Sequence, residues 1–253
     1  MLLLVVITLC VAMVAHATSI TVVGLGPGSA PCITRETWGK LETTPRVHLR
    51  TAQHPAVADL PCRDGVVTTF DHLYERLASF SEVYDTIVDE LVREAAAGSD
   101  VLYAVPGDPC VGEKSTLLLR QRCAAAGIPF HVEPAVSFLE PSLSLLGADL
   151  LPCTTVIDAV AVAESSYPPF CVNSGGTLLC QVYSRSVASN VKLSLLAAFP
   201  PFHSVTLLHG EEGGGGEAVT LPLCEVCLHV WPWLGALSER SIKRPLQPCQ
   251  RAH

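Results

Sequence analysis

Residues 19–28 read SITVVGLGPG, an apolar, β-branched run that leads into closely spaced glycines. A run without polar alternation is typical of a strand that is buried on both faces of a parallel sheet. Glycines at the carboxyl end of such a strand allow a tight turn, and open α/β sheets bind their ligands at these ends. The segment therefore predicts an α/β fold with a ligand-binding turn at residues 24–28.

The rest of the first half alternates strands and helices in the same way. In residues 82–97 an apolar residue recurs at every fourth position, which indicates a helix with one buried face. The alternation favours a largely parallel sheet, because parallel strands need a crossover between them. The further strands expected are 46–51, 66–70, 101–105 and 130–133, and the helices are 33–41, 82–97 and 111–126.

The second half repeats this pattern less regularly. The run EEGGGGE at 211–217 predicts a flexible loop without helix or strand propensity. We expect two α/β subdomains, 19–133 and 134–235, followed by an unpacked tail at 236–253. The elements expected in the second half are helices at 137–146 and 187–198, strands at 154–162, 177–183 and 204–209, and an edge strand at 228–231.

Composition excludes several classes of protein. The chain has 253 residues, of which 49% are hydrophobic and 16% charged, so disorder is excluded as its main state. The formal net charge of −8 leaves no broad basic field for phosphates, which argues against a nucleic-acid partner. No apolar run after the N-terminus reaches the roughly 18 residues that a membrane-spanning helix needs. We therefore expect no membrane span.

Residues 1–18 form an apolar leader that stands apart from the predicted fold. Ala15, His16 and Ala17 have the small-x-small pattern of a signal-peptidase site, although no Lys or Arg precedes the apolar run. A secretory signal, an organelle leader and a misassigned start codon all remain open. The cellular compartment is therefore left undecided.

A second glycine turn follows the strand predicted at 101–105. Pro106 and Pro109 flank Gly107 and Asp108, so the loop is rigid and its backbone can approach a ligand closely. The carboxylate of Asp108 suits a neutral or cationic ligand with hydroxyl groups better than a phosphate. The alternative is a purely structural turn in which Asp108 caps a helix that starts at Val111.

Two other ligand classes fit the sequence less well. The first turn departs from a dinucleotide fingerprint, because Ser29 takes its sixth position. The next strand ends in Arg50, where an NAD-dependent oxidoreductase would need an acid for the ribose. Cys224 and Cys227 have the spacing of half a zinc site, but no second pair lies at the required distance, so no metal site is predicted.

Together, GLGPG at 24–28 and PGDP at 106–109 resemble the tetrapyrrole (corrin and porphyrin) methyltransferase family, which uses S-adenosylmethionine. The resemblance covers about residues 19–230. The chain looks like the methylase half of bacterial proteins in which this domain is fused to a MazG-type nucleotide pyrophosphohydrolase. No acidic helix pair of the MazG type follows residue 235, so pyrophosphate hydrolysis is not assigned. Supporting matches are LRT at 49–51, FD at 70–71, LYE at 73–75, YAVPG at 103–107, SFL at 137–139 and QVY at 181–183.

The resemblance implies a tetrapyrrole methylase-like fold of two α/β subdomains, with the cofactor in the cleft between them, and a homodimer. The acceptor it implies is a tetrapyrrole, another small molecule or a peptide. It also implies that Pro27 faces cofactor and substrate, that Gly107, Asp108 and Val111 hold the cofactor from the first subdomain, and that Ser137, Phe138, Gln181 and Val182 contact it from the second.

Methyl transfer from a sulfonium is an in-line displacement, which depends on alignment more than on strong acids or bases. Tyr74 and Tyr84 are the predicted catalytic residues, as phenols that orient the acceptor around the start of a helix. The alternative for both is a place in the core or at its rim. A different class of function also stays open, that of an S-adenosylmethionine-binding or interaction module without turnover.

Overall fold

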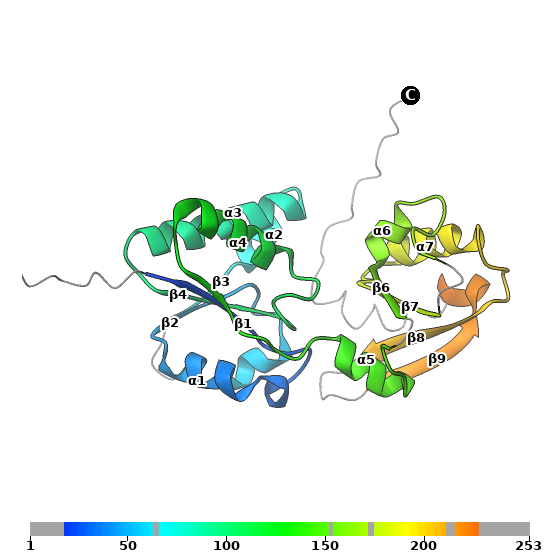
Figure 1. Ribbon diagram of the computed structural model, residues 1–253, viewed down its shortest axis with the longest axis horizontal. Coiled ribbons are helices and arrows are strands. Elements are labelled where there is room, and N and C mark those ends of the chain that lie inside the picture. The colour runs from blue at the N-terminus through cyan, green and yellow to red at the C-terminus, as the bar shows by residue number, and fades with distance from the viewer. Residues whose placement is uncertain (1–17, 63–65, 152–153, 172–174, 211–215, 228–253) are drawn as a thin grey trace, which may run out of the picture.

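The computed structural model describes residues 18–62, 66–151, 154–171, 175–210 and 216–227. The first half of the chain forms one lobe around a five-stranded sheet, and the second half forms another lobe beside it (Figure 1). Residues 1–17 of the leader, the tail and the edge strand predicted at 228–231 lie outside the described residues.

The sheet of the first lobe is parallel throughout, with the strand order β3-β2-β4-β1-β5. Because its strands are parallel, all their carboxyl ends lie at one edge. The turns after β1 and β4 are neighbours there, since these two strands pair directly. The five strands predicted from the sequence are thus confirmed, with bounds β1 (Ile20–Gly24), β2 (Arg46–Leu49), β3 (Val66–Thr69), β4 (Val101–Val105) and β5 (Phe130–Val132).

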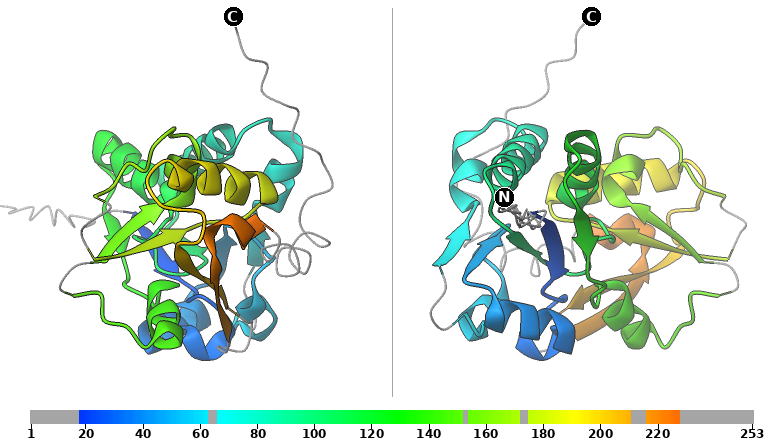
Figure 2. Two further views of the ribbon diagram at one scale, coloured as in Figure 1. Left: turned by 90° about the vertical axis from the view of Figure 1, so that its right-hand side faces the viewer. Right: turned by 60° about the vertical axis from the view of Figure 1, so that its left-hand side comes forward.

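Helices cover both faces of this sheet. The helices α2, α3 and α4 lie over one face and α1 over the other (Figures 1 and 2). The buried stripe of α3 includes Ile87 and Leu91, which pack with Val22 and Tyr103 of the sheet in one apolar core. Burying such side chains is the main favourable term in folding. The helices are α1 (Arg35–Thr43), α2 (Asp71–Arg76), α3 (Phe80–Ala96) and α4 (Lys114–Ala126), with short 3-10 turns at Ala30–Cys32 and Pro55–Asp59.

The second lobe contains two small sheets, of which β6 and β7 pair in parallel and β8 and β9 antiparallel. An apolar core that includes Val162, Ala188 and Leu223 lies within this lobe. Its elements are α5 (Leu139–Leu146), β6 (Thr154–Asp158), α6 (Ala159–Ala163), β7 (Gly176–Cys180), α7 (Arg185–Leu196), β8 (Ser204–Gly210), β9 (Gly216–Pro222) and the 3-10 turn Leu223–Glu225.

Three predicted helices start later than expected, and the one predicted from residue 33 begins at Arg35, after its N-cap Thr34. The helix predicted from residue 111 begins at Lys114, because Gly112 has a positive φ of 70° and Glu113 caps the helix by accepting a hydrogen bond from the Ser115 N–H. The helix predicted from residue 137 begins at Leu139. The residues just before Lys114 and Leu139 are not helical, which apolar periodicity does not reveal.

Three predictions for the second half were wrong in their extent. The strand predicted at 154–162 ends at Asp158, whose carboxylate caps α6, so the apolar run changes from strand to helix. The strand predicted at 177–183 ends at Cys180, because Gln181 has a φ of 67°. The loop predicted at 211–217 extends too far, since β9 already begins at Gly216.

Candidate functional site

The two glycine turns are joined by reciprocal hydrogen bonds. The Gly26 N–H donates to the Gly107 carbonyl over 3.2 Å, and the Gly107 N–H donates to the Gly26 carbonyl over 2.8 Å. One residue earlier, the Leu25 N–H donates to the Val105 carbonyl over 2.8 Å. The turns that the sequence singled out therefore meet at the carboxyl edge of the sheet and form one continuous backbone surface.

Glycine is required at these positions for different reasons. A Cβ on Gly24 would collide with the Gly107 carbonyl oxygen and lie 2.5 Å from the Ala135 Cβ. Gly26 has a φ of 76°, and a Cβ there would lie 2.6 Å from the Cys32 carbonyl oxygen. Gly107 also has a positive φ, of 68°, but no atom lies within 4 Å of where its Cβ would be. The backbone at Gly107 is thus bare on a side where a ligand can approach it.

Asp108 fastens the second turn to the chain that leads into the second lobe. Its side chain is buried, and its two carboxylate oxygens accept hydrogen bonds of 2.7 Å from the N–H groups of Cys110 and Ala135. Asp108 does not cap α4, because Glu113 does. The structural alternative for this residue is therefore wrong in that detail, and its carboxylate acts first as a clamp on the backbone around the turn.

Predicted residues from the second lobe reach the same region. Gln181 is the one non-glycine residue with a positive φ in the described part of the chain, and its Nε2 donates to the Gly112 carbonyl over 3.4 Å. A Cβ on Gly112 would lie 2.7 Å from that nitrogen and 3.7 Å from the Phe138 ring. Phe138 and Gln181 therefore meet the loop that includes Val111, which brings three predicted cofactor residues together.

The other predicted cofactor residues have local roles in the fold. The buried Ser137 hydroxyl donates to the Glu140 carboxylate over 2.7 Å and accepts from the Leu139 N–H over 2.9 Å, which starts α5. Val182 packs against the apolar core of the second lobe. Pro27 is half-buried in the first turn. Their part in cofactor binding stays a prediction.

A buried polar network that the sequence did not reveal lies beside the second turn. Arg50, at the end of β2, forms an ion pair with Glu113 at 3.1 Å. The other oxygen of Glu113 accepts from the Ser115 hydroxyl over 2.6 Å, and that hydroxyl is 3.0 Å from the phenol of Tyr103. Only the strand order places β2 beside β4, so no local signal in the sequence links Arg50 to Glu113.

Tyr74 and Tyr84 lie together near Arg50. Their ring centroids are 6.5 Å apart in an edge-to-face arrangement, and both rings pack partly against the core of the first lobe. Burial raises the pKa of Tyr74 and of Tyr84 above the ordinary value, although the positive charge of Arg50 opposes this. Both phenols are therefore protonated at neutral pH, so they can orient a bound molecule by hydrogen bonding but do not supply a phenolate base.

His54 supports the first turn. Its Nε2 lies 3.0 Å from the Gly26 carbonyl, and its Nδ1 accepts a hydrogen bond of 3.3 Å from the Ala56 N–H. These two contacts require a neutral ring with its proton on Nε2, because a protonated Nδ1 has no lone pair to accept with. Burial lowers the pKa of His54, which the bond to Gly26 only partly offsets.

Acidification from about pH 7 to pH 5 is expected to destabilise the protein. Because the pKa of His54 is lowered on folding, the unfolded chain takes up a proton near pH 6.5 while the folded protein does not. The stability present above that pH is lost as the pH falls towards the folded pKa. Thermal unfolding midpoints across this range should fall less for His54→Gln than for the wild type. His131→Gln is the control, because His131 is exposed. If the unfolding midpoint of His54→Gln fell with pH as steeply as that of the wild type, the role given to His54 would be contradicted.

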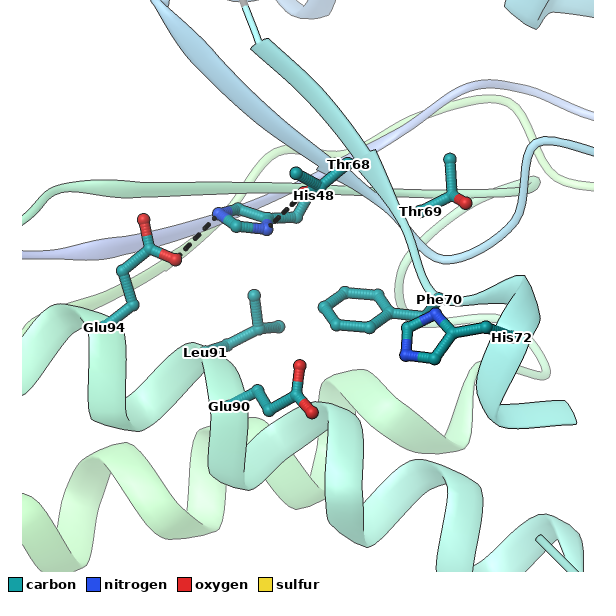
Figure 3. Close-up of a pocket in the computed structure, with 8 residues that line it drawn as sticks. All are labelled: His48, Thr68, Thr69, Phe70, His72, Glu90, Leu91 and Glu94. Carbon is teal, nitrogen blue, oxygen red and sulfur yellow. Dashed lines mark hydrogen bonds and ion pairs between the residues drawn. The ribbon is translucent and has the colours of Figure 1, made fainter. Parts of the chain in front are cut away.

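A cavity of about 420 Å³ lies away from the glycine turns, between β2, β3 and α3. His48 lines it, with Nδ1 2.8 Å from the Thr68 hydroxyl and Nε2 3.2 Å from the Glu94 carboxylate, as Figure 3 shows. Both ring nitrogens thus have partners within the protein. A second cavity, of about 300 Å³, lies in the second lobe. Neither cavity includes a predicted site residue.

Neither a metal centre nor a membrane span is found among the described residues. Within them, no group of three or more His, Cys, Asp or Glu side chains is arranged to hold a metal ion. No helix there has the length and apolar character that crossing a membrane requires.

The chain is similar to several known proteins. Among curated proteins, "Uncharacterized protein YabN" of Bacillus subtilis (strain 168) is 33% identical over 210 residues, covering 83% of this chain and 42% of that protein. The chain thus spans less than half the length of this relative.

Two solved structures share the fold. A uroporphyrin-III-C-methyltransferase from Thermus thermophilus superposes with a TM-score of 0.61 at 22% identity, covering 90% of this chain and 98% of that one. The native form of a uroporphyrin III C-methyltransferase from Thermus thermophilus superposes with a TM-score of 0.55 at 18% identity. That match covers 83% of this chain and 86% of the other. The model of the family described as Tetrapyrrole (Corrin/Porphyrin) Methylases matches residues 19–202. Because that match covers most of the chain, the protein belongs to the tetrapyrrole (corrin/porphyrin) methylase family.

Proposed function

We propose that this protein is a methyltransferase that uses S-adenosylmethionine, bound at the paired glycine turns. The observation that carries the proposal is the bare backbone at Gly107, held in place by its hydrogen bonds to Gly26 and open on the side where a Cβ would project. An open glycine backbone beside groups from both lobes fits a folded nucleoside cofactor. Membership of the methylase family supports the same function.

The protein's contribution to such a reaction is alignment. Bound S-adenosylmethionine supplies an electrophilic methyl group, whose transfer needs the acceptor in line with the breaking carbon–sulfur bond. Asp108 holds the second turn against the segment after β5, and His54 holds the first turn through Gly26. The phenols of Tyr74 and Tyr84 then orient the acceptor. Pro27, beside Gly26, faces both molecules in this proposal.

The remaining assignments follow from the same proposal. The cofactor lies between subdomains at 19–133 and 134–235, with Val111, Phe138 and Gln181 beside it. The acceptor is a small molecule or a peptide, and the active form is a homodimer.

Calorimetric titration with S-adenosylhomocysteine, the demethylated cofactor, tests the binding step. We expect micromolar binding by the wild type and binding weakened by roughly tenfold in Asp108→Asn, because an amide offers one acceptor oxygen for two buried N–H groups. Asp149→Asn is the matched control, since this exposed carboxylate holds only one local N–H. Absence of binding to the folded wild type would remove the proposal, and binding of NADH instead would favour the oxidoreductase.

Turnover separates an enzyme from a binding module. The full chain is incubated with a cell extract and a methyl donor that carries an isotope label, and mass spectrometry follows the label. A labelled product that depends on the wild-type chain supports the enzyme. Tight cofactor binding without any labelled product would identify a module without turnover.

A further inference from the structure

We infer that the buried ion pair between Arg50 and Glu113 positions the loop of residues 107–113 for cofactor binding, and that stabilising the fold is not its role. Arg50 and Glu113 are positioning residues in this inference, because neither is given a contact with the cofactor. The inference rests on the proposed methyltransferase function and concerns how that same site is held in shape.

The loop of residues 107–113 is fixed at both of its ends. Near its start, the carboxylate of Asp108 accepts two backbone hydrogen bonds of 2.7 Å. At its end, Glu113 caps α4 by accepting a hydrogen bond of 3.1 Å from the Ser115 N–H. Val111 lies between these two attachments, so its position depends on both of them.

Glu113 is tied to two neighbouring strands of the sheet. One of its carboxylate oxygens lies 3.1 Å from Nη1 of Arg50, the residue directly after β2. The other oxygen accepts from the Ser115 hydroxyl over 2.6 Å, and this hydroxyl is 3.0 Å from the phenol oxygen of Tyr103 in β4. The Arg50 N–H also donates to the carbonyl of Ala104 in β4 over 2.9 Å. The end of the loop is therefore held against the sheet.

The ion pair is poorly suited to stabilising the fold. The side chain of Glu113 is 3% exposed and that of Arg50 is 23% exposed, so both charges have lost most of their contact with water. The Nε of Arg50 is buried and has no hydrogen-bond partner among the described residues. Desolvation of a buried ion pair often costs as much as the attraction returns, and an unpaired buried donor adds to that cost. The position that the pair imposes on the loop explains it better.

That position matters where the two lobes meet. Gly112 directly precedes Glu113, and its carbonyl accepts from Nε2 of Gln181 over 3.4 Å. A Cβ on Gly112 would lie 2.7 Å from the same nitrogen, so a shift of the loop would alter this contact. Because Val111 and Gln181 are both predicted cofactor residues, displacing the end of the loop would change the cofactor site on two sides together.

A double-mutant cycle tests the inference. Glu113→Gln and Arg50→Met each leave one buried charge without its partner, so each should lower the free energy of unfolding and weaken S-adenosylhomocysteine binding by roughly tenfold. The double variant has no unpaired charge, so its free energy of unfolding in urea should return at least to the wild-type value. Its affinity in calorimetric titration should stay about tenfold lower, because the loop is no longer tied to β2.

The double variant decides between a positioning role and a purely structural one. Wild-type affinity in the double variant would overturn the inference. Affinity that follows the free energy of unfolding through all three variants would also overturn it, because the ion pair would then act on the fold as a whole. Unchanged affinity in both single variants would have the same consequence.

Arg46→Met is the matched control. Arg46 lies at the other end of β2, where its Nη1 forms an ion pair with Glu94 at 2.8 Å. The same substitution thus removes a contact of the same kind away from the loop, and S-adenosylhomocysteine affinity should not change. A comparable loss of affinity in Arg46→Met would assign the effect to β2 in general and overturn the inference.

Hydrogen exchange separates this inference from the proposed function. In the cofactor-free protein, mass spectrometry should show the amides of residues 110–113 exchanging faster in the double variant than in the wild type, while those of α3 are unchanged. Equal exchange in the loop would overturn the inference whether or not the cofactor binds. Failure of the wild type to bind S-adenosylhomocysteine, together with faster exchange in the variant, would remove the proposed function and leave the attachment of the loop to β2 standing.

Discussion

Gly107→Ala is expected to lose S-adenosylhomocysteine affinity by roughly tenfold to a hundredfold while the protein stays folded. The added methyl group meets no atom of the protein within 4 Å, so it would project into the space proposed for the cofactor. Overpacking of a fitted contact costs about 1–3 kcal/mol, which corresponds to this loss of affinity. Calorimetric titration measures the change.

Gly127→Ala is a closely matched control for this variant. Gly127 ends α4 with a φ of 67°, against 68° at Gly107, and a Cβ there likewise meets nothing within 4 Å. Both variants should therefore lose about 1–2 kcal/mol of stability from a left-handed backbone. Only Gly107→Ala should also lose cofactor affinity. Unchanged affinity in Gly107→Ala would show that the cofactor does not approach this backbone.

Gly24→Ala should destabilise the protein by about 3 kcal/mol or more, the largest stability change that we expect from a single methyl group. The new Cβ would collide with the Gly107 carbonyl oxygen and lie 2.9 Å from the Pro109 ring. Neither neighbour is the end of a flexible side chain, so the second turn itself would have to move. Urea denaturation followed by circular dichroism measures the free energy of unfolding.

Gly39→Ala should change the free energy of unfolding in the opposite direction to Gly24→Ala. Gly39 lies within α1, where a Cβ would meet nothing within 4 Å, and no positive φ is needed. Alanine should therefore stabilise the protein by about 0.5–1 kcal/mol through its higher helix propensity. Wild-type stability in Gly24→Ala would contradict the close packing of the turns.

The sequence predicted the first lobe well because its signals are local. The apolar run before Gly24 marks a buried strand, and the period of four through Ile87 marks a helix. The antiparallel strand β9 was missed because its first residue, Gly216, belongs to a glycine-rich run whose strand conformation depends on pairing with β8. Pairing between strands is a tertiary effect, which propensity does not contain.

In the candidate site, too, the features with a local sequence signal were predicted, and those that depend on tertiary contacts were not. Gly26 and Gly107 were predicted because turns with bare backbone have a sequence signature. The ion pair between Arg50 and Glu113 depends on which strands become neighbours, and its two residues lie far apart in the chain. The contact between Gln181 and Gly112 was not predicted, since it joins two lobes. The family resemblance implied only that Gln181 and Val111 both contact the cofactor.

The reciprocal bonds between Gly26 and Gly107 bear on how a ligand would associate. Two flexible loops that did not contact each other would lose conformational entropy on binding a molecule, and this loss would weaken the affinity. Loops already held in register by their own backbones are preorganised, so little entropy remains to be lost. A ligand then binds to a rigid site. Different ligands would therefore differ more in their dissociation rates than in their association rates.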